Sequence, residues 1–327
     1  PLSAYCPGAL AEVGGEQGTD LGSIDRVGKA TFNLWGVEAE PLENGGLFAQ
    51  VKSKDQSTKL LSANQTQAIS RPRLAGLAAT YCPMPAAQGY FLAADSGPGS
   101  ESILHLANPN DVDLVVDLEL QLAEEVVQDR VPLAAGEHKL IPLVSLSGAE
   151  SSYAVRFQTS GLPVAAFMQL REVSGLNATG VAVVPPTKPL AAGSLVGLVV
   201  AENAFVAPRL RVFNPGLESV DLDLQAINGE EFELFQIKVP AGTLVEKDLK
   251  LPAGANLISF EASAEVALSV RNDVITTKLD FEWLIPTEVF DRALFLRSPG
   301  NTQLVLANPN LVPALLAMAL MARAIKP

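Results

Sequence analysis

Apolar and polar residues alternate with a period of two along much of this chain, and the alternation predicts β-strands. In residues 112–120 five apolar positions of one face alternate with Asp113, Asp117 and Glu119, and residues 220–226 repeat the pattern. Acidic residues confined to one face are typical of an antiparallel strand with one buried and one solvated side. Turns that contain Pro and Gly follow both strands. The pattern therefore predicts an all-β protein.

One apolar phrase ending in Asn-Pro occurs three times, in residues 103–110, 210–216 and 304–310. Proline removes a ladder donor and disfavours helix at the residue before it, so each phrase reads as a strand with a stop. The copies lie roughly 100 residues apart, which is the size of a β-sandwich domain rather than of a solenoid repeat. We therefore expect tandem immunoglobulin-like antiparallel β-sandwich domains, each of about six or seven short strands.

Proline-rich joints near residues 81–85, 184–189 and 284–287 divide the chain. The expected organisation is given by four segments: a degenerate N-terminal β unit (1–80), a first β-sandwich repeat (81–184), a second repeat (185–285) and the start of a third repeat (286–327). Proline-dense joints are extended and semi-rigid, so they would fix the angles between domains.

The end of the chain, residues 311–322, is uncharged but too short for a membrane helix. We favour a domain truncated from a longer native protein, because two strands cannot bury their own surface. The alternative is an apolar edge that pairs with a partner chain. Leu311, Leu315 and Leu316 would then belong to a contact surface, and residues 181–200, which are nearly uncharged, are a second candidate surface.

The composition limits the class of partner. Hydrophobic residues make up 48% of the 327 residues and charged residues 18%, which suits well-buried β cores. The formal net charge is −13 and the isoelectric point about 4.7. Contacts to phosphate need clustered Lys and Arg, so this balance argues against nucleic acid and against docking on anionic lipid.

The chain has two cysteines, Cys6 and Cys82, and both occur in a Tyr-Cys-Pro context. Matched cysteines at the two ends of one unit predict a disulfide that closes the N-terminal unit, and hence an oxidising compartment. The alternative is a pair of buried free thiols.

The sequence offers few candidate catalytic residues. Its two histidines are His105, within the repeated strand, and His138, beside a turn where we expect it to be solvated. Nucleophile-elbow, zincin, P-loop and Cys-x-x-Cys motifs are absent. The acids of residues 111–119 alternate along a strand and mark its solvated face rather than a calcium site. We expect no enzyme activity, no cofactor and no bound metal.

Sugar-binding sandwiches present exposed aromatic residues, yet aromatics are only 6% here. The two tryptophans, Trp35 and Trp283, read first as core residues and second as contact residues for a ligand or partner.

Four motifs together resemble a family of uncharacterised actinobacterial envelope proteins that carry a domain of unknown function. They are Cys-Pro-Gly at 6–8, Leu-Ala-Asn-Pro at 106–109 and 306–309, and Val-Pro-Ala-Gly at 239–242. The Phe-Asn-Pro copy at 213–215 departs from the pattern. Such proteins typically have an N-terminal membrane anchor before a secreted region. The resemblance implies an exported location and supplies no activity.

These observations predict a non-enzymatic, extracytoplasmic structural or interaction protein of the cell envelope. Its β-sandwich repeats would dock a protein partner or an envelope polysaccharide, and a segment outside this chain would tether it to the membrane. A carbohydrate-binding envelope module and an accessory subunit of a membrane-anchored enzyme complex are the alternatives.

Overall fold

The computed structural model describes residues 3–14, 23–35, 38–42, 45–50, 62–229, 231–275 and 279–287. Within these ranges almost all regular structure is antiparallel β-sheet, and the helix α1 (Val144–Ser147) is a single turn. The expectation of an all-β protein is confirmed. No helical segment of the described ranges has the length and apolar character needed to cross a membrane.

The first unit, residues 88–184, consists of two four-stranded sheets of order β12-β11-β14-β9 and β13-β10-β15-β16. Its eight strands, where the sequence pattern led us to expect six or seven, are β9 (Gln88–Ala94), β10 (Ser100–Ala107), β11 (Leu114–Gln121), β12 (Val126–Leu133), β13 (His138–Pro142), β14 (Tyr153–Thr159), β15 (Ala165–Ser174) and β16 (Asn177–Val184).

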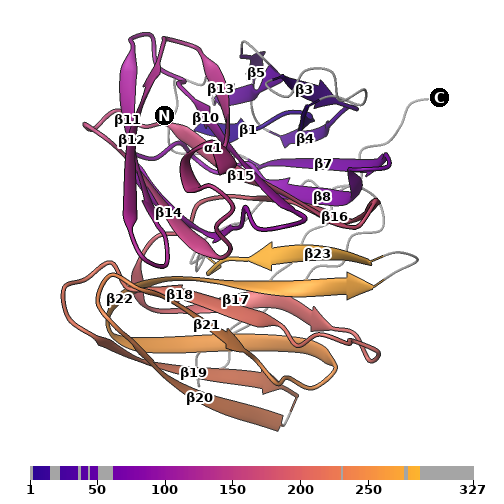
Figure 1. Ribbon diagram of the computed structural model, residues 1–327, viewed down its shortest axis with the longest axis vertical. Coiled ribbons are helices and arrows are strands. Elements are labelled where there is room, and N and C mark those ends of the chain that lie inside the picture. Colours follow the sequence, from indigo (N-terminus) through magenta and orange to yellow (C-terminus); the bar gives the residue numbers. More distant parts are fainter. Residues whose placement is uncertain are drawn as a thin grey trace.

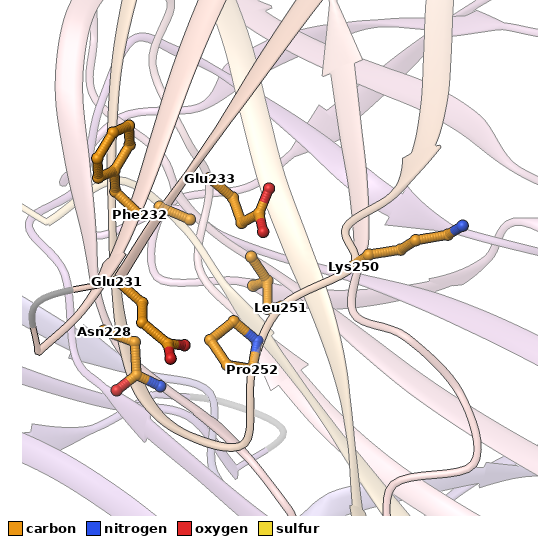
Figure 2. Close-up of a pocket in the computed structure, with 8 residues that line it drawn as sticks. Asn228, Glu231, Phe232, Glu233, Lys250, Leu251 and Pro252 are labelled. Atoms are coloured by element: carbon orange, nitrogen blue, oxygen red, sulfur yellow. The ribbon is translucent and has the colours of Figure 1, made fainter.

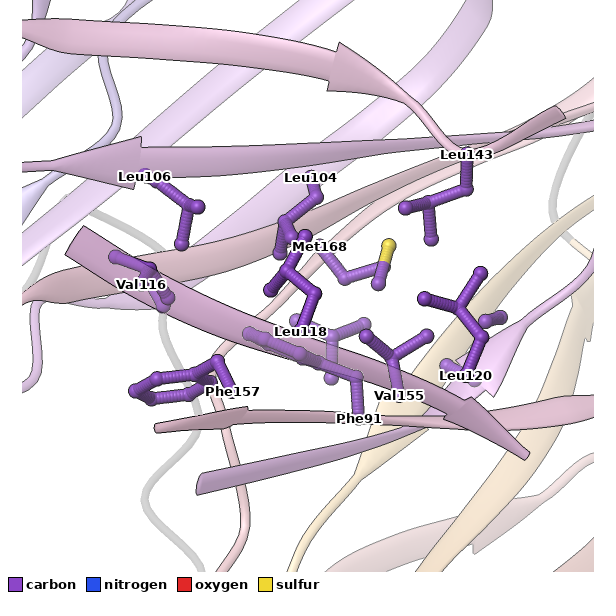
Figure 3. Packing of buried hydrophobic residues seen from close by; sticks show 14 of the residues in the cluster. Phe91, Leu104, Leu106, Val116, Leu118, Leu120, Leu143, Val155, Phe157 and Met168 are labelled. Atoms are coloured by element: carbon purple, nitrogen blue, oxygen red, sulfur yellow. The ribbon is translucent and has the colours of Figure 1, made fainter. Parts of the chain in front are cut away.

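The two sheets enclose one hydrophobic core (Figure 3). Val116 and Leu118 of β11 point into it, while Asp117 between them is exposed, as the alternation of apolar and acidic residues predicts. Phe91 and Phe157 meet inside the core with ring centroids 5.9 Å apart.

The second unit, residues 190–284, repeats this strand order. Its strands are β17 (Leu190–Val200), β18 (Arg209–Phe213), β19 (Val220–Asn228), β20 (Glu231–Val239), β21 (Leu244–Asp248), β22 (Gly254–Ile275) and β23 (Leu279–Leu284). The first half of β22 pairs with β19 and β17, and its second half pairs with β18 and β23. One long strand therefore replaces β14 and β15 of the first unit.

The asparagine of the repeated phrase ties the strands of each unit together. The buried Asn108 donates through Nδ2 to the carbonyls of Val112 and Ala134, at 2.8 and 3.0 Å. Asn214 does the same for Glu218 and Val239, at 2.7 and 3.0 Å. The phrase is thus more than a proline stop, because a buried amide satisfies loop carbonyls that would otherwise be unpaired.

The N-terminal unit, residues 3–81, has three small sheets of order β1-β6-β5, β2-β3 and β4-β7-β8. Its strands are β1 (Ser3–Cys6), β2 (Leu10–Val13), β3 (Ile24–Val27), β4 (Thr31–Trp35), β5 (Glu38–Pro41), β6 (Leu47–Gln50), β7 (Ser62–Ser70) and β8 (Ala75–Tyr81). A disulfide joins Cys6 to Cys82, as the matched Tyr-Cys-Pro contexts predicted.

The three units pack in series (Figure 1). The N-terminal unit covers the outer face of the β13-β10-β15-β16 sheet, where Tyr5 and Leu10 contact Phe167 and Val183. The outer face of β9 and β14 in turn covers the matching sheet of the second unit, where Tyr90 and Leu92 contact Phe213 and Ala267. Each unit therefore buries the same face of the unit that follows it.

Candidate interaction surface

Both histidines lie in the joint between the N-terminal unit and the first unit. His105 and His138 are each 1% exposed, so the expectation of a solvated His138 is wrong. Their rings are 5.5 Å apart, and the hydroxyl of Tyr5 is 2.8 Å from Nδ1 of His138. Nη2 of Arg26 lies 2.9 Å from the same nitrogen. Residues from the N-terminal unit thus bury the ring of His138, although this residue lies beside a turn of the first unit.

Burial and the nearby charge of Arg26 lower the pKa of His138 to about 3. Burial, Arg26 and His138 also lower the pKa of His105. The ring of His138 makes hydrogen-bonding contacts to Tyr5 and Arg26, and the ring of His105 packs beside it. Both neutral rings are enclosed in the joint, whereas a general base must reach a substrate. We assign this cluster to the joint.

Arg211 holds the joint between the first and second units. Its Nη1 donates to the carbonyls of Leu92 and Ala94, at 2.9 and 3.1 Å, and its Nε donates to Glu246 at 2.7 Å. The guanidinium also lies 4.9 Å from the ring centroid of Trp283. Burial lowers the pKa of Arg211, but the charge of Glu246 opposes the shift. A buried guanidinium with these partners fixes the orientation of two units.

Acidic residues complete this joint. Glu172 of β15 forms a two-pronged ion pair with Arg271 of β22, in which Nη2 lies 2.8 Å from Oε2. The carboxylate of Asp280 accepts hydrogen bonds from the backbone N–H groups of Leu77 and Val181, at 2.7 and 3.0 Å. Strand β23 is therefore bound to both preceding units.

The contact residues predicted from the sequence lie partly in a joint and partly outside the described residues. Trp283 is half-buried in the joint, where it packs on the first core and on Arg211. Trp35 ends β4, and its side chain is outside what the structure describes. Leu311, Leu315 and Leu316 also lie outside the described residues. Residues 181–200 form the end of β16, a short connection and β17, and Val181 and Val183 are buried under the N-terminal unit, so that part is not a free surface.

An exposed apolar patch lies on β20, the edge strand of the second unit. Phe232 is 62% exposed and Leu234 66% exposed, and both leave the strand on its outer side. Phe235, Ile237 and Val239 face the core instead. Both faces of β20 thus carry apolar residues, whereas the core explains only one set of them. Sequence reasoning missed this patch, although the apolar residues on both faces of 231–239 were a visible signal.

A hollow of about 350 Å³ opens beside the patch (Figure 2). Glu231 and Glu233 line it from β20, and Leu251 and Pro252 close the opposite wall. Figure 2 shows Glu233 and Phe232 on opposite sides of the strand, with Lys250 extending away from the acids. The hollow is small, acidic on one wall and apolar on the other.

The equivalent edge of the first unit is protected. Strand β12 presents Arg130 and Pro132 on its outer side, and Arg130 pairs with Asp117 at 2.9 Å. Charge and proline discourage another strand from pairing with an edge. By strand register Val126 and Gln128 occupy the places of Phe232 and Leu234. The apolar patch is therefore a property of the second unit and not of the fold.

Among the described residues, no group of three or more His, Cys, Asp or Glu side chains is placed to hold a metal ion.

Comparison with known proteins places the chain in a family but gives it no activity. The model of a "Family of unknown function (DUF5719)" matches residues 40–322. No curated protein matches. Among solved structures, an "anti-sigma factor domain-containing protein" is similar at 10% sequence identity, with a TM-score of 0.12. The alignment covers 87% of this chain and 96% of that chain. A likeness that low carries no argument about fold or function.

Proposed function

The chain belongs to the family of unknown function matched over residues 40–322, and we propose that it is a non-enzymatic structural protein of the extracytoplasmic envelope that docks a protein partner. The exposed apolar patch on β20 carries this proposal. The disulfide supports an oxidising location outside the cytoplasm. The resemblance noted from its sequence motifs favours an actinobacterial, membrane-tethered envelope protein.

The partner segment that fits this surface is an extended strand. In the described residues β20 pairs on one side with β19, and its other side faces no strand. A partner strand added there gains main-chain hydrogen bonds, while pockets read alternate side chains. Phe232 and Leu234 would anchor apolar residues, and Glu231 and Glu233 would favour a basic one.

The joints support the same function. Arg211 and Arg271 bind the first unit through buried or half-buried polar contacts, and Asp280 accepts an exposed hydrogen bond from Leu77 of the N-terminal unit. These contacts support a fixed place for the β20 edge relative to the N-terminal unit. A rigid support reduces the ordering cost of binding. The proposed role is therefore to position one edge for a partner.

A photo-cross-linking amino acid at position 232 tests the proposal on the full chain in envelope extract, with position 126 as the matched control on β12. We expect a discrete protein adduct from position 232 and none from position 126. Glycan attached at 232 in place of protein would favour the carbohydrate-binding alternative. The same adducts from both positions would refute the proposal.

A further inference from the structure

The first unit binds the second through a defined part of its outer face. The ring of Tyr90 on β9 meets the ring of Phe213 on β18 with centroids 5.8 Å apart. Leu92 and Ala154 complete the apolar contact, and Arg211 binds the carbonyls of Leu92 and Ala94. The docking face is thus the outer side of β9 and β14.

The second unit carries the same backbone features at the matching places on β17 and the first half of β22. A Cβ on Gly89 would lie 2.7 Å from the ring of Phe157, and one on Gly193 would lie 2.9 Å from the ring of Phe260. Each strand then has a bulge in which two residues oppose one: Leu92 and Ala93 in β9, and Val196 and Gly197 in β17. Tyr90 therefore corresponds to Ser194.

The chain also leaves both units along the same path. After β16, the backbone of Thr187 pairs with that of Tyr90, with N–O distances of 2.8 and 3.0 Å. After β23, the N–H of Thr287 donates to the carbonyl of Ser194 at 2.7 Å. Its hydroxyl accepts from the N–H of Val196 at 3.3 Å. In the first unit, the strand that follows Thr187 belongs to the second unit, which docks on this face.

The next repeat of the phrase follows at residues 304–310, which lie outside the described residues. We propose that the outer face of β17 and the first half of β22 docks this third copy, as β9 and β14 dock the strand β18. The phrase aligns Ala307 with Phe213, so the large pair of Tyr90 and Phe213 becomes the small pair of Ser194 and Ala307. Small residues on both sides permit a close approach of the two strands.

Val305 takes the place of Arg211 in this alignment. The proposed joint with residues 304–310 therefore lacks the guanidinium that binds two carbonyls in the joint between the first and second units. It relies on apolar contact. This interface lies on the β17 side of the sheet, while the β20 edge lies at the opposite end of the strand order. The inference is independent of the proposed partner site.

Thiol cross-linking in the full chain tests the proposal. Ser194→Cys with Ala307→Cys, treated with a short bis-maleimide, should give an intrachain link in the monomer, because the native cysteines are joined to each other. Tyr90→Cys with Phe213→Cys is the positive control in the joint that the structure describes. Ser194→Cys with Leu306→Cys tests register, because Leu306 aligns with the core residue Val212.

An intrachain link for Ser194 and Ala307, several-fold more abundant than for Ser194 and Leu306, supports the proposal. No link under conditions that join positions 90 and 213 overturns it, as does a link between two chains, which would assign the face to a second copy. Hydrogen exchange provides a test without new thiols. Ala307→Arg should speed exchange of the β17 amides and leave those of β10 and β15 unchanged; unchanged β17 exchange would overturn the docking.

Discussion

The first and second units share one strand order and bury the same face of the same sheet, yet different chemistry covers that face. At matching positions of β10 and β18 stand His105 and Arg211. His105 lies beside His138 in a joint where Arg26 contacts His138 and where Arg171, paired with Glu101, donates to the carbonyl of Arg73. A disulfide lies in the covering unit. Arg211 belongs to a joint of ion pairs with Glu246 and Asp95. The backbone sets which face is buried, and the side chains set how the joint responds to solution conditions.

The largest expected effect on stability comes from removing the disulfide, which lies in the unit that covers the first joint. Replacing Cys6 and Cys82 together by Ala removes a bridge between residues 76 apart in sequence. A bridge over a loop of this length stabilises by about 4 kcal/mol, mainly by restricting the unfolded chain. Hydrogen exchange should show this loss at β1 and β7 and leave β18 and β21 unchanged. A loss shared equally by both joints would contradict the separation.

Removing Arg211 should break the second joint. Arg211→Ala leaves the carbonyls of Leu92 and Ala94 unpaired and deprives Glu246 of its partner, so we expect a loss of about 3 kcal/mol in the free energy of unfolding. Urea denaturation measures it. Arg209→Ala is the matched control on the same strand, because its pair with Asp248 is largely exposed and should contribute less than about 1 kcal/mol. Equal losses for both variants would show that burial of Arg211 does not matter.

Acid should weaken the first joint before the second. The folded pKa of His138 is about 3, below the ordinary 6.5, so the unfolded chain takes up a proton that the folded chain does not. Its stabilisation is complete above pH 6.5 and is lost as the pH falls toward 3, with about 2 kcal/mol lost between pH 6.5 and 5. Exchange at β1 and β13 measured against pH checks this, and His138→Gln should flatten the slope.

The second joint provides the internal control for that titration. Burial would raise the pKa of Glu246, but the hydrogen bond from Ser152 and the charge of Arg211 outweigh it, so the pKa is lowered. A carboxylate of this kind contributes stability above its ordinary pKa and loses it as the pH falls through the folded value. The protection of the β18 and β21 amides, taken relative to the unfolded chain at the same pH, should therefore stay constant from pH 6.5 to 5. A parallel loss at both joints would contradict the assignment to His138.

The sequence predicted the strands of these units and their buried faces better than it predicted the contacts between residues far apart in the chain. Alternation in residues 112–120 predicted both the strand and its buried face, because period and burial are local properties. His138 was predicted wrongly because Tyr5 and Arg26, which bury it, lie more than 100 residues away in sequence. Asn108 was credited only with preceding a proline, since no periodicity reveals which carbonyls a buried amide will reach. The apolar residues on both faces of 231–239 signalled a second apolar surface, but the relative position of the sheets was needed to show that the side of Phe232 is the uncovered one.

The smallest effect on stability is expected from moving the β20 surface onto β12. Val126→Phe with Gln128→Leu copies Phe232 and Leu234 onto the matching outer positions of the first unit. Both positions are substantially exposed, so the free energy of unfolding should change by less than about 0.5 kcal/mol. Pro132 remains and removes a main-chain donor, so apolar contact would be transplanted without a complete strand edge. If apolar anchors suffice, a photo-cross-linker placed on β12 at position 130 now captures the partner taken by β20. If position 130 does not capture the partner, the backbone of β20, which contains no proline, is the feature that the two units do not share.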